Sequence, residues 1–214
     1  MKASKNNEMK LRTLHYFSGV VITLFVGLHL FNHAYSIFGV AEHIALMQKL
    51  RVVYRNPLIE SVLLLSVLLQ IVSGIKLFLK QRKFVASDFD KLHVWSGLYL
   101  AFFFVIHLSA VLGGRFFLHL DTNFYFGVAG LNTFPFNLFF VPYYALAMVS
   151  FFGHVAAIHS KKMKQNIVGF SPKNQAKAIL LIGICFTLLV FYGLTNHFQG
   201  VEIPSEFGVL IGEK

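Results

Sequence analysis

The sequence is poor in charged residues, in acids above all, and it contains a single cysteine. Charged residues make up 13% of the 214 residues, with 9 acidic against 19 basic, whereas 56% are apolar and 25 are phenylalanine. Soluble domains carry about 25% charged residues, so this scarcity excludes an ordinary soluble protein and indicates a membrane protein. Cys185 stands alone in an apolar segment, which excludes an internal disulfide and any cysteine-ligated cluster within the chain.

Long apolar runs are abundant. Each has about 20 residues or more, the length of a helix that crosses a hydrocarbon core of about 30 Å. The first run has no small-residue cleavage site and is rich in Phe and His, so we do not interpret it as a signal peptide. We therefore predict an all-α membrane protein, a single domain over residues 1–214 with five transmembrane helices at roughly 14–38, 58–79, 94–114, 137–159 and 178–198.

Basic residues alternate between the two sides of these spans. One set of connections, the N-terminal segment included, holds 13 Lys and Arg against 5 in the other set. Because positive flanks tend to remain in the cytoplasm, we expect an integral protein of the inner (cytoplasmic) membrane with its N-terminus inside and its C-terminus outside. An inward-facing positive collar accounts for most of the net charge of +10 without nucleic acid, and it offers a docking surface beside the lipid for a soluble partner.

Three connections are longer than simple turns. Residues 40–55 have an apolar face with basic interruptions and are expected to form an interfacial helix on the outer side. Residues 115–136 are expected to form an ordered outer loop anchored by aromatic residues, and residues 161–177 a cytoplasmic linker. Neither outer connection carries recognisable chemistry.

A motif with two histidines occurs twice. Leu14-His15 is followed by Ser18-Gly19 and then by His29, and Leu92-His93 is followed by Ser96-Gly97 and then by His107. The two histidines of each copy are 14 residues apart, nearly four turns, so they share one face of a helix. The glycines let bulky groups or helices approach closely, and we expect both Ser-Gly pairs to border a bound cofactor.

Depth decides which histidines can act together. The first and third spans run in the same direction, and His29 and His107 each lie about 22 Å from the cytoplasmic edge at 1.5 Å per residue. Intramembrane histidines are costly unless partnered, and iron in haem accepts two axial imidazoles. The spacing thus favours a haem b held between these two spans. The alternatives are a neutral imidazole bonded to a neighbouring carbonyl or Ser, and a zinc site, for which no carboxylate or thiol lies at this depth.

The chain resembles a known family in its arrangement of motifs. It is similar to the five-helix cytochrome b anchor of succinate dehydrogenases and fumarate reductases. The shared features are Ser-Gly followed ten residues later by His on the first and third spans, a histidine late in the fourth span, and a basic link into a fifth. The resemblance covers residues from about 12 to 200. It implies two haems b, with His29 and His107 as axial ligands of the distal one and His154 as one ligand of the proximal one. It also implies electron transfer between membrane quinone and a flavoprotein, through an iron–sulfur subunit docked on the cytoplasmic side.

The chain departs from that family at Gln70. The second span should supply the partner of His154, but the position that fits holds a glutamine, which is a poor haem ligand. Three alternatives remain open: the second haem is absent, His154 holds it with an unusual or missing partner, or His15 and His93 hold it at the inner edge. His15 and His93 could instead anchor the helices at the membrane interface, or form hydrogen bonds to a haem propionate or a quinone oxygen.

A quinone needs hydrogen-bond partners and a proton path. Glu60 is the only acid within an apolar run, and it is a candidate proton acceptor near the distal haem or an ordinary carboxylate in the first turn of a helix. Arg12, Ser18 and Trp95 form the rival quinone environment at the inner edge.

The expected function is that of a haem b anchor subunit without dicarboxylate chemistry, since no catalytic residue is assigned within this chain. The alternative is a stand-alone transmembrane carrier or oxidoreductase with two haems on the repeated spans and no dehydrogenase partner. A third hypothesis is a structural or transport protein whose histidines only pack against neighbouring side chains.

Overall fold

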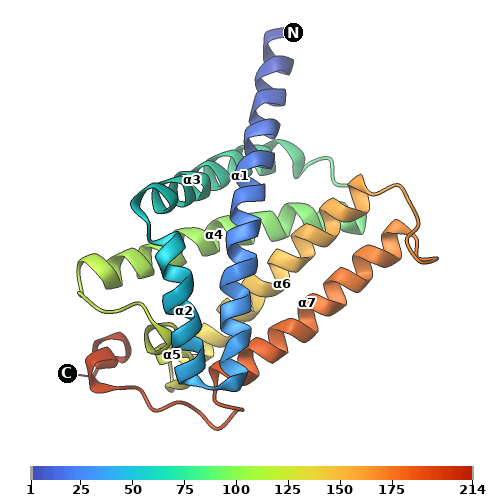
Figure 1. The fold of residues 1–214 in the computed structure, drawn as a ribbon. Helices are drawn as coiled ribbons and strands as arrows, with labels where there is room; N and C mark the ends of the chain where they lie inside the picture. The colour runs from blue at the N-terminus through green and yellow to red at the C-terminus, as the bar shows by residue number, and fades with distance from the viewer. Residues whose placement is uncertain (1, 214) are drawn as a thin grey trace.

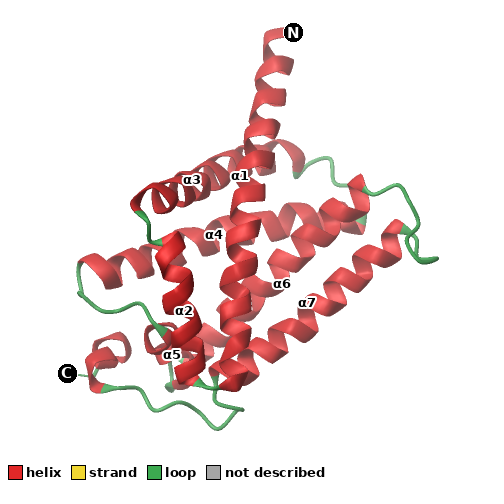
Figure 2. Ribbon diagram, viewed as in Figure 1, coloured by secondary structure: helices red, strands yellow, loops and turns green. Residues whose placement is uncertain are grey.

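The computed structural model describes residues 2–213, and its regular structure is helical throughout (Figures 1 and 2). The elements in chain order are α1 (Lys2–Ala34), η1 (Tyr35–Phe38), α2 (Val40–Tyr54), α3 (Pro57–Gln81), α4 (Asp88–Phe116), α5 (Phe124–Asn132), α6 (Asn137–Lys162), α7 (Pro172–Leu194) and η2 (Ser205–Ile211).

Local sequence signals fix several helix starts. Asn56 accepts a hydrogen bond from the Leu58 amide and is followed by Pro57, which suits the first helical position. Ser87 and Asp90 form a reciprocal capping box at the start of α4. Ser171 caps α7 and is again followed by a proline. The chain between the apolar runs therefore encodes where each of these spans begins.

Five helices are long and apolar enough to cross a membrane, namely those covering Asn6–Phe38, Pro57–Gln81, Asp88–Phe116, Asn137–Lys162 and Pro172–Leu194. This matches the five predicted spans. Large apolar side chains on them remain open to the surroundings, for example Leu24, Leu68 and Leu188, whose exposed fractions are 69%, 56% and 61%. Such a surface suits lipid rather than water, which indicates an integral membrane protein.

The five long helices form a closed ring. Each packs on the next in the order α1, α3, α4, α6, α7, and α7 returns to pack on α1. Within the described residues, α1 and α4 are not packing neighbours, because α3 holds them from one side and α6 with α7 from the other. A ring of this kind encloses space between α1 and α4, the two helices that carry the repeated motif.

The two ends of the bundle differ. We call the basic end the one where α1, α4 and α7 begin, and the loop end the one that carries α2, α5 and η2 (Figure 1). The first turns of α1 project beyond the other helices at the basic end (Figure 1). At the loop end, Phe124 and Val128 of α5 belong to the main apolar core cluster.

The connections are more structured than the sequence indicated. The helix expected within residues 40–55 is confirmed as α2. The predicted loop at 115–136 instead contains α5, and α4 continues to Phe116. Asn123 starts α5 by accepting hydrogen bonds from the amides of Tyr125 and Phe126, a capping signal that the aromatic composition concealed. The chain thus repeats a unit of long helix, short helix and long helix, as α1–α2–α3 and α4–α5–α6, and α7 follows.

Candidate functional site

A cavity of about 280 Å³ lies inside the ring, towards the loop end. We call it the central cavity. Its wall is mostly apolar and aromatic, with Phe25, Phe103, Phe104 and Tyr144 among the lining side chains. The volume is close to the lower limit of sites for small organic molecules, about 300–1,000 Å³. An apolar cavity with a few polar groups is the usual form of a cofactor site.

His29 of α1 and His107 of α4 meet across this cavity. Their ring centroids are 6.1 Å apart, so the structure brings together the two histidines that the sequence analysis paired. Both line the cavity and keep partial exposure although they lie inside the ring. Phe25 stacks on His29 and Phe103 on His107, and these aromatic faces hold the two imidazoles on opposite sides of the space.

The distance between the two rings suits one metal ion between them. A metal–imidazole bond is about 2 Å long, which places two axial ring centroids about 6 Å apart. The Nε2 atoms of His29 and His33 lie 3.1 Å apart in a hydrogen bond, so ligation through Nε2 of His29 requires that bond to open. Among residues 2–213, no group of three or more His, Cys, Asp or Glu side chains is arranged to hold a metal ion. Two imidazoles alone would suit a metal that brings its own equatorial ligands, as haem does.

His33 lines this cavity and His43 lies beside His33, with ring centroids 5.5 Å apart, and the sequence analysis singled out neither. His33 follows His29 by four residues, so it lies on the same face of α1, and it also lines the cavity. His43 of α2 is 1% exposed and bonds Asn32 through its Nε2, 3.2 Å from the amide nitrogen. Burial, with smaller contributions from the charges of His29 and Arg51, lowers the pKa of His43 to about 4. The i, i+4 spacing was the available signal for His33, whereas His43 is on a separate helix.

Charged residues gather at the loop-end mouth of the cavity. Arg51 and Arg55 of α2 and Arg115 of α4 line it, together with Glu60 in the first turn of α3. Arg115 pairs with Glu60. Arg51 bonds Asp121 at 2.7 Å, and Arg55 bonds the Thr122 hydroxyl at 2.9 Å. The loop end of the cavity therefore carries three cations against two carboxylates, whereas the rest of its wall is mostly apolar and includes the two imidazoles.

Three features of the central cavity fit haem b. The flat apolar body would lie among aromatic side chains, the two imidazoles stand at the separation that axial ligands need, and cations at the mouth match the acidic edge of the macrocycle. His29 and His107 would hold the iron, and the bound group would supply one-electron chemistry. The pocket at the basic end is larger, but no histidine lines it.

At the basic end, the two copies of the motif receive equivalent side chains. On α1, Gln70 of α3 donates through Nε2 to the carbonyl of His15 at 2.5 Å and to the Ser18 hydroxyl at 3.1 Å. On α4, His154 of α6 lies with its Nδ1 3.1 Å from the carbonyl of His93 and 3.2 Å from the Ser96 hydroxyl. Each side chain thus binds the same two positions of its motif.

The glycines of the motif make room for these two side chains. A Cβ atom on Gly19 would come within 2.7 Å of Gln70, and one on Gly97 within 3.0 Å of His154. Ser18, Gly19 and Gln70 therefore form one cluster, and Ser96, Gly97 and His154 form the other. Gln70 stands where the internal repeat places a histidine in its second copy, which is the departure that the sequence pointed to.

His15 and His93 are not brought together as a ring pair. The Nδ1 of His15 lies 2.8 Å from the hydroxyl of Ser73 on α3. That hydroxyl gives its proton to the Leu69 carbonyl, so His15 donates at Nδ1. His93 instead stacks on His154 with ring centroids 4.5 Å apart, closer than the about 6 Å of two rings bound to one metal.

The three histidines at this end border neither of the two cavities described for the structure. None of His15, His93 and His154 lines the central cavity or the pocket among Glu8, Arg12, Asp90 and Lys161. The Nδ1 of His93 is buried without a hydrogen-bond partner. These side chains serve instead to hold α1 on α3 and α4 on α6, through hydrogen bonds that a membrane interior makes necessary.

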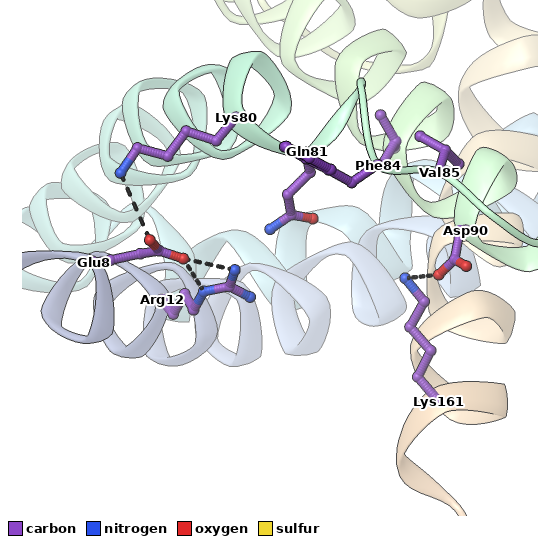
Figure 3. A pocket seen from close by; sticks show the side chains of 9 residues that line it. Glu8, Arg12, Lys80, Gln81, Phe84, Val85, Asp90 and Lys161 are labelled. Atoms are coloured by element: carbon purple, nitrogen blue, oxygen red, sulfur yellow. Dashed lines mark hydrogen bonds and ion pairs between the residues drawn. The ribbon is translucent and has the colours of Figure 1, made fainter. Parts of the chain in front are cut away.

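A separate pocket of about 460 Å³ opens at the same end among the charged residues (Figure 3). Glu8 binds Arg12 of its own helix and lies 4.0 Å from Lys80 of α3, and Asp90 pairs with Lys161 of α6 at 2.7 Å. The lining acids are thus already paired with bases. Trp95, which we placed in a rival quinone environment with Arg12 and Ser18, is 59% exposed and packs on Phe78. It does not line this pocket.

A scan against protein-family models, a search of curated proteins and a search of solved structures each found no match. Function is therefore inferred from the residues and their geometry.

Proposed function

We propose that this chain is a haem b-containing membrane subunit that passes electrons between membrane quinone and an iron–sulfur partner, as the anchor of a succinate dehydrogenase or fumarate reductase-like complex. The observation that carries the proposal is the pair His29 and His107, 6.1 Å apart across an apolar cavity. Packed, hydrogen-bonded histidines alone would leave no reason for a cavity between them.

The proposal is for one haem, at His29 and His107. Of the three alternatives for a second group, the structure favours its absence, because His93 fills the space beside His154 and Gln70 is bonded to α1. His15 and His93 do not face each other as ligands, so no observation favours a carrier with two haems on the repeated spans.

Glu60 is the proposed proton acceptor for quinone. It lines the central cavity at the loop end and its charge is balanced by Arg115. A quinol bound at this mouth would lie beside both the carboxylate and the histidine pair, so that the two protons and two electrons released on its oxidation to quinone would leave at one place. Glu60 is also a first-turn carboxylate of α3, which favours the helix start.

The test is the haem content of the purified protein, measured as the pyridine haemochrome. We expect one haem per chain, and a loss of at least tenfold in His29→Ala and in His107→Ala. The control is His119→Ala, an exposed histidine outside the cavity. A wild-type chain without haem would overturn the proposal. If His33→Ala lost the haem and His29→Ala kept it, our ligand assignment would be wrong.

Co-purification tests the partner. Isolation of the tagged chain from its native membrane should bring along a flavoprotein and an iron–sulfur subunit in equal amounts. A haem-containing chain that is isolated alone, and is reduced by quinol alone, would instead favour the stand-alone carrier.

A further inference from the structure

The arginines at the mouth of the central cavity have far more hydrogen-bond donors than the chain uses. A guanidinium carries five N–H donors, yet each of these three donates one side-chain hydrogen bond by distance and angle: Arg51 to Asp121, Arg55 to Thr122 and Arg115 to Glu60. The Nε of Arg51 is buried without a partner. A buried donor without a partner is costly, so Arg51 calls for an acceptor from a ligand, and the partly exposed guanidinium groups of Arg55 and Arg115 are available to share it.

The three arginines converge from different elements. Arg51 and Arg55 are one helical turn apart on α2, and Arg115 is at the last turn of α4. All three line the same cavity as His29 and His107. Arg51 is the most deeply placed, with 12% of its side chain exposed, against 31% for Arg55 and 22% for Arg115.

We propose that Arg51, Arg55 and Arg115 form a carboxylate-binding site that holds the two propionates of the haem and so fixes which edge of the macrocycle faces the loop end. This inference rests on the proposed function. Arg115 follows His107 by eight residues on α4, about 12 Å of helix, so a plane held at the imidazoles extends towards the guanidinium groups. Arginine suits this role because its planar fork binds a carboxylate through two parallel hydrogen bonds.

The charge at the mouth agrees with this orientation. Glu60 and Asp121 compensate two of the three cations, which leaves one positive charge beside an apolar wall. One ligand carboxylate would balance that charge, and the donors that remain on the three guanidinium groups are enough to bind a second carboxylate. A neutral ligand edge would leave both unmet.

The experiment compares haem b with its dimethyl ester, in which both carboxylates are blocked. The haem-free protein in detergent is titrated with each compound, and binding is followed by the Soret absorbance. We expect the wild type to bind haem b at least tenfold more tightly than the ester, since hydrogen bonds between charged groups are the strong ones. In Arg51→Gln, and further in Arg51→Gln combined with Arg55→Gln, the preference should fall towards one.

The matched control is Lys49→Gln, an exposed cation on the same helix that does not line the cavity, and it should keep the full preference. Equal binding of haem b and the ester by the wild type would overturn this inference and leave the haem proposal intact. No binding of either compound would overturn the haem proposal itself. Far-ultraviolet circular dichroism shows whether each variant is folded. If the double variant is not folded, Arg55→Gln alone is titrated in its place.

Discussion

The two histidine clusters of this protein use the same sequence motif in opposite ways. At the loop end, the rings of His29 and His107 approach edge to face at 6.1 Å beside the central cavity, and an aromatic ring stacks on each of them. At the basic end, His15 bonds Ser73 while His93 stacks directly on His154. The two clusters differ because of their positions along the helices. Near the loop end α1 and α4 border the central cavity, whereas near the basic end Gln70 of α3 bonds α1 and His154 of α6 bonds α4. A histidine of the repeated motif thus either lines a cavity or bonds and stacks on a neighbouring helix, according to which side chain lies opposite it.

The largest expected effect separates the two clusters by haem content. His107→Ala should lose the haem at least tenfold, whereas His154→Ala and His93→Ala should keep one haem per chain and lose only thermal stability. His154→Ala removes the partner of Ser96 and of the His93 carbonyl, and His93→Ala removes the ring that stacks on His154. The pyridine haemochrome and the melting temperature are measured on the same preparations. A loss of half of the haem in His154→Ala would mean that the basic end also holds a haem, and the comparison would fail.

The second effect concerns proton transfer at the mouth of the cavity. Glu60→Gln should slow the reduction of the haem by a water-soluble quinol by about 10²-fold, the usual lower range for loss of a general base. Haem content should not change. Stopped-flow absorbance gives the rate, and Glu42→Gln, an exposed acid on α2, is the control. If Glu60→Gln leaves the rate unchanged, Glu60 is not the proton acceptor, and its remaining role is to stabilise the start of α3.

A smaller effect sharpens the role of the basic end as packing. Gly19→Ala places a Cβ atom 2.7 Å from Gln70 and should cost about 1–3 kcal/mol, as crowding of a packed site does. Gly27 lies on the same helix with nothing within 4 Å of its added Cβ, so Gly27→Ala should leave the melting temperature unchanged or raise it. Equal melting temperatures of the two variants in detergent would show that the bonds from Gln70 to α1 contribute little.

The smallest expected effect is a pH dependence of stability from His43. Its pKa is lowered to about 4 in the folded protein, from an ordinary value of 6.5. The unfolded chain therefore binds the proton more readily, and folding stability falls as the pH decreases from about 6.5 towards 4. His43→Gln, which is neutral throughout, should show a shallower fall of melting temperature between pH 7 and pH 4.5. A slope identical to that of the wild type would assign the effect to other groups.

The parts of this structure that depend on one helix at a time were predictable. Span lengths follow from apolar runs, and the common level of His29 and His107 follows from a constant rise on two helices that run in the same direction. The helix at α2 was also predictable from its pattern. The short helix α5 was not predictable, because Asn123, which caps it, lies in an aromatic segment that we expected to be a loop.

The parts that depend on how helices cross were not predictable. That His93 would stack on His154 rather than face His15 depends on the angle between α4 and α6. The convergence of Arg51 and Arg55 with Arg115 depends on where α2 lies beside the end of α4. Gln70 was recognised as unusual from its position in the span, but only the crossing of α1 and α3 shows that it makes the same two bonds as His154.

The repeated unit of long helix, short helix and long helix has a consequence for how the protein is inserted. Each unit contains two candidate spans, so if both cross, the chain returns to its starting side before the next unit begins. The two halves would then enter the bilayer in the same orientation, and one insertion pattern would serve both. The fifth span, α7, has no counterpart in either half. If all five helices cross, it alone places the two termini on opposite sides of the membrane, and by packing on α1 it joins the end of the second half to the start of the first.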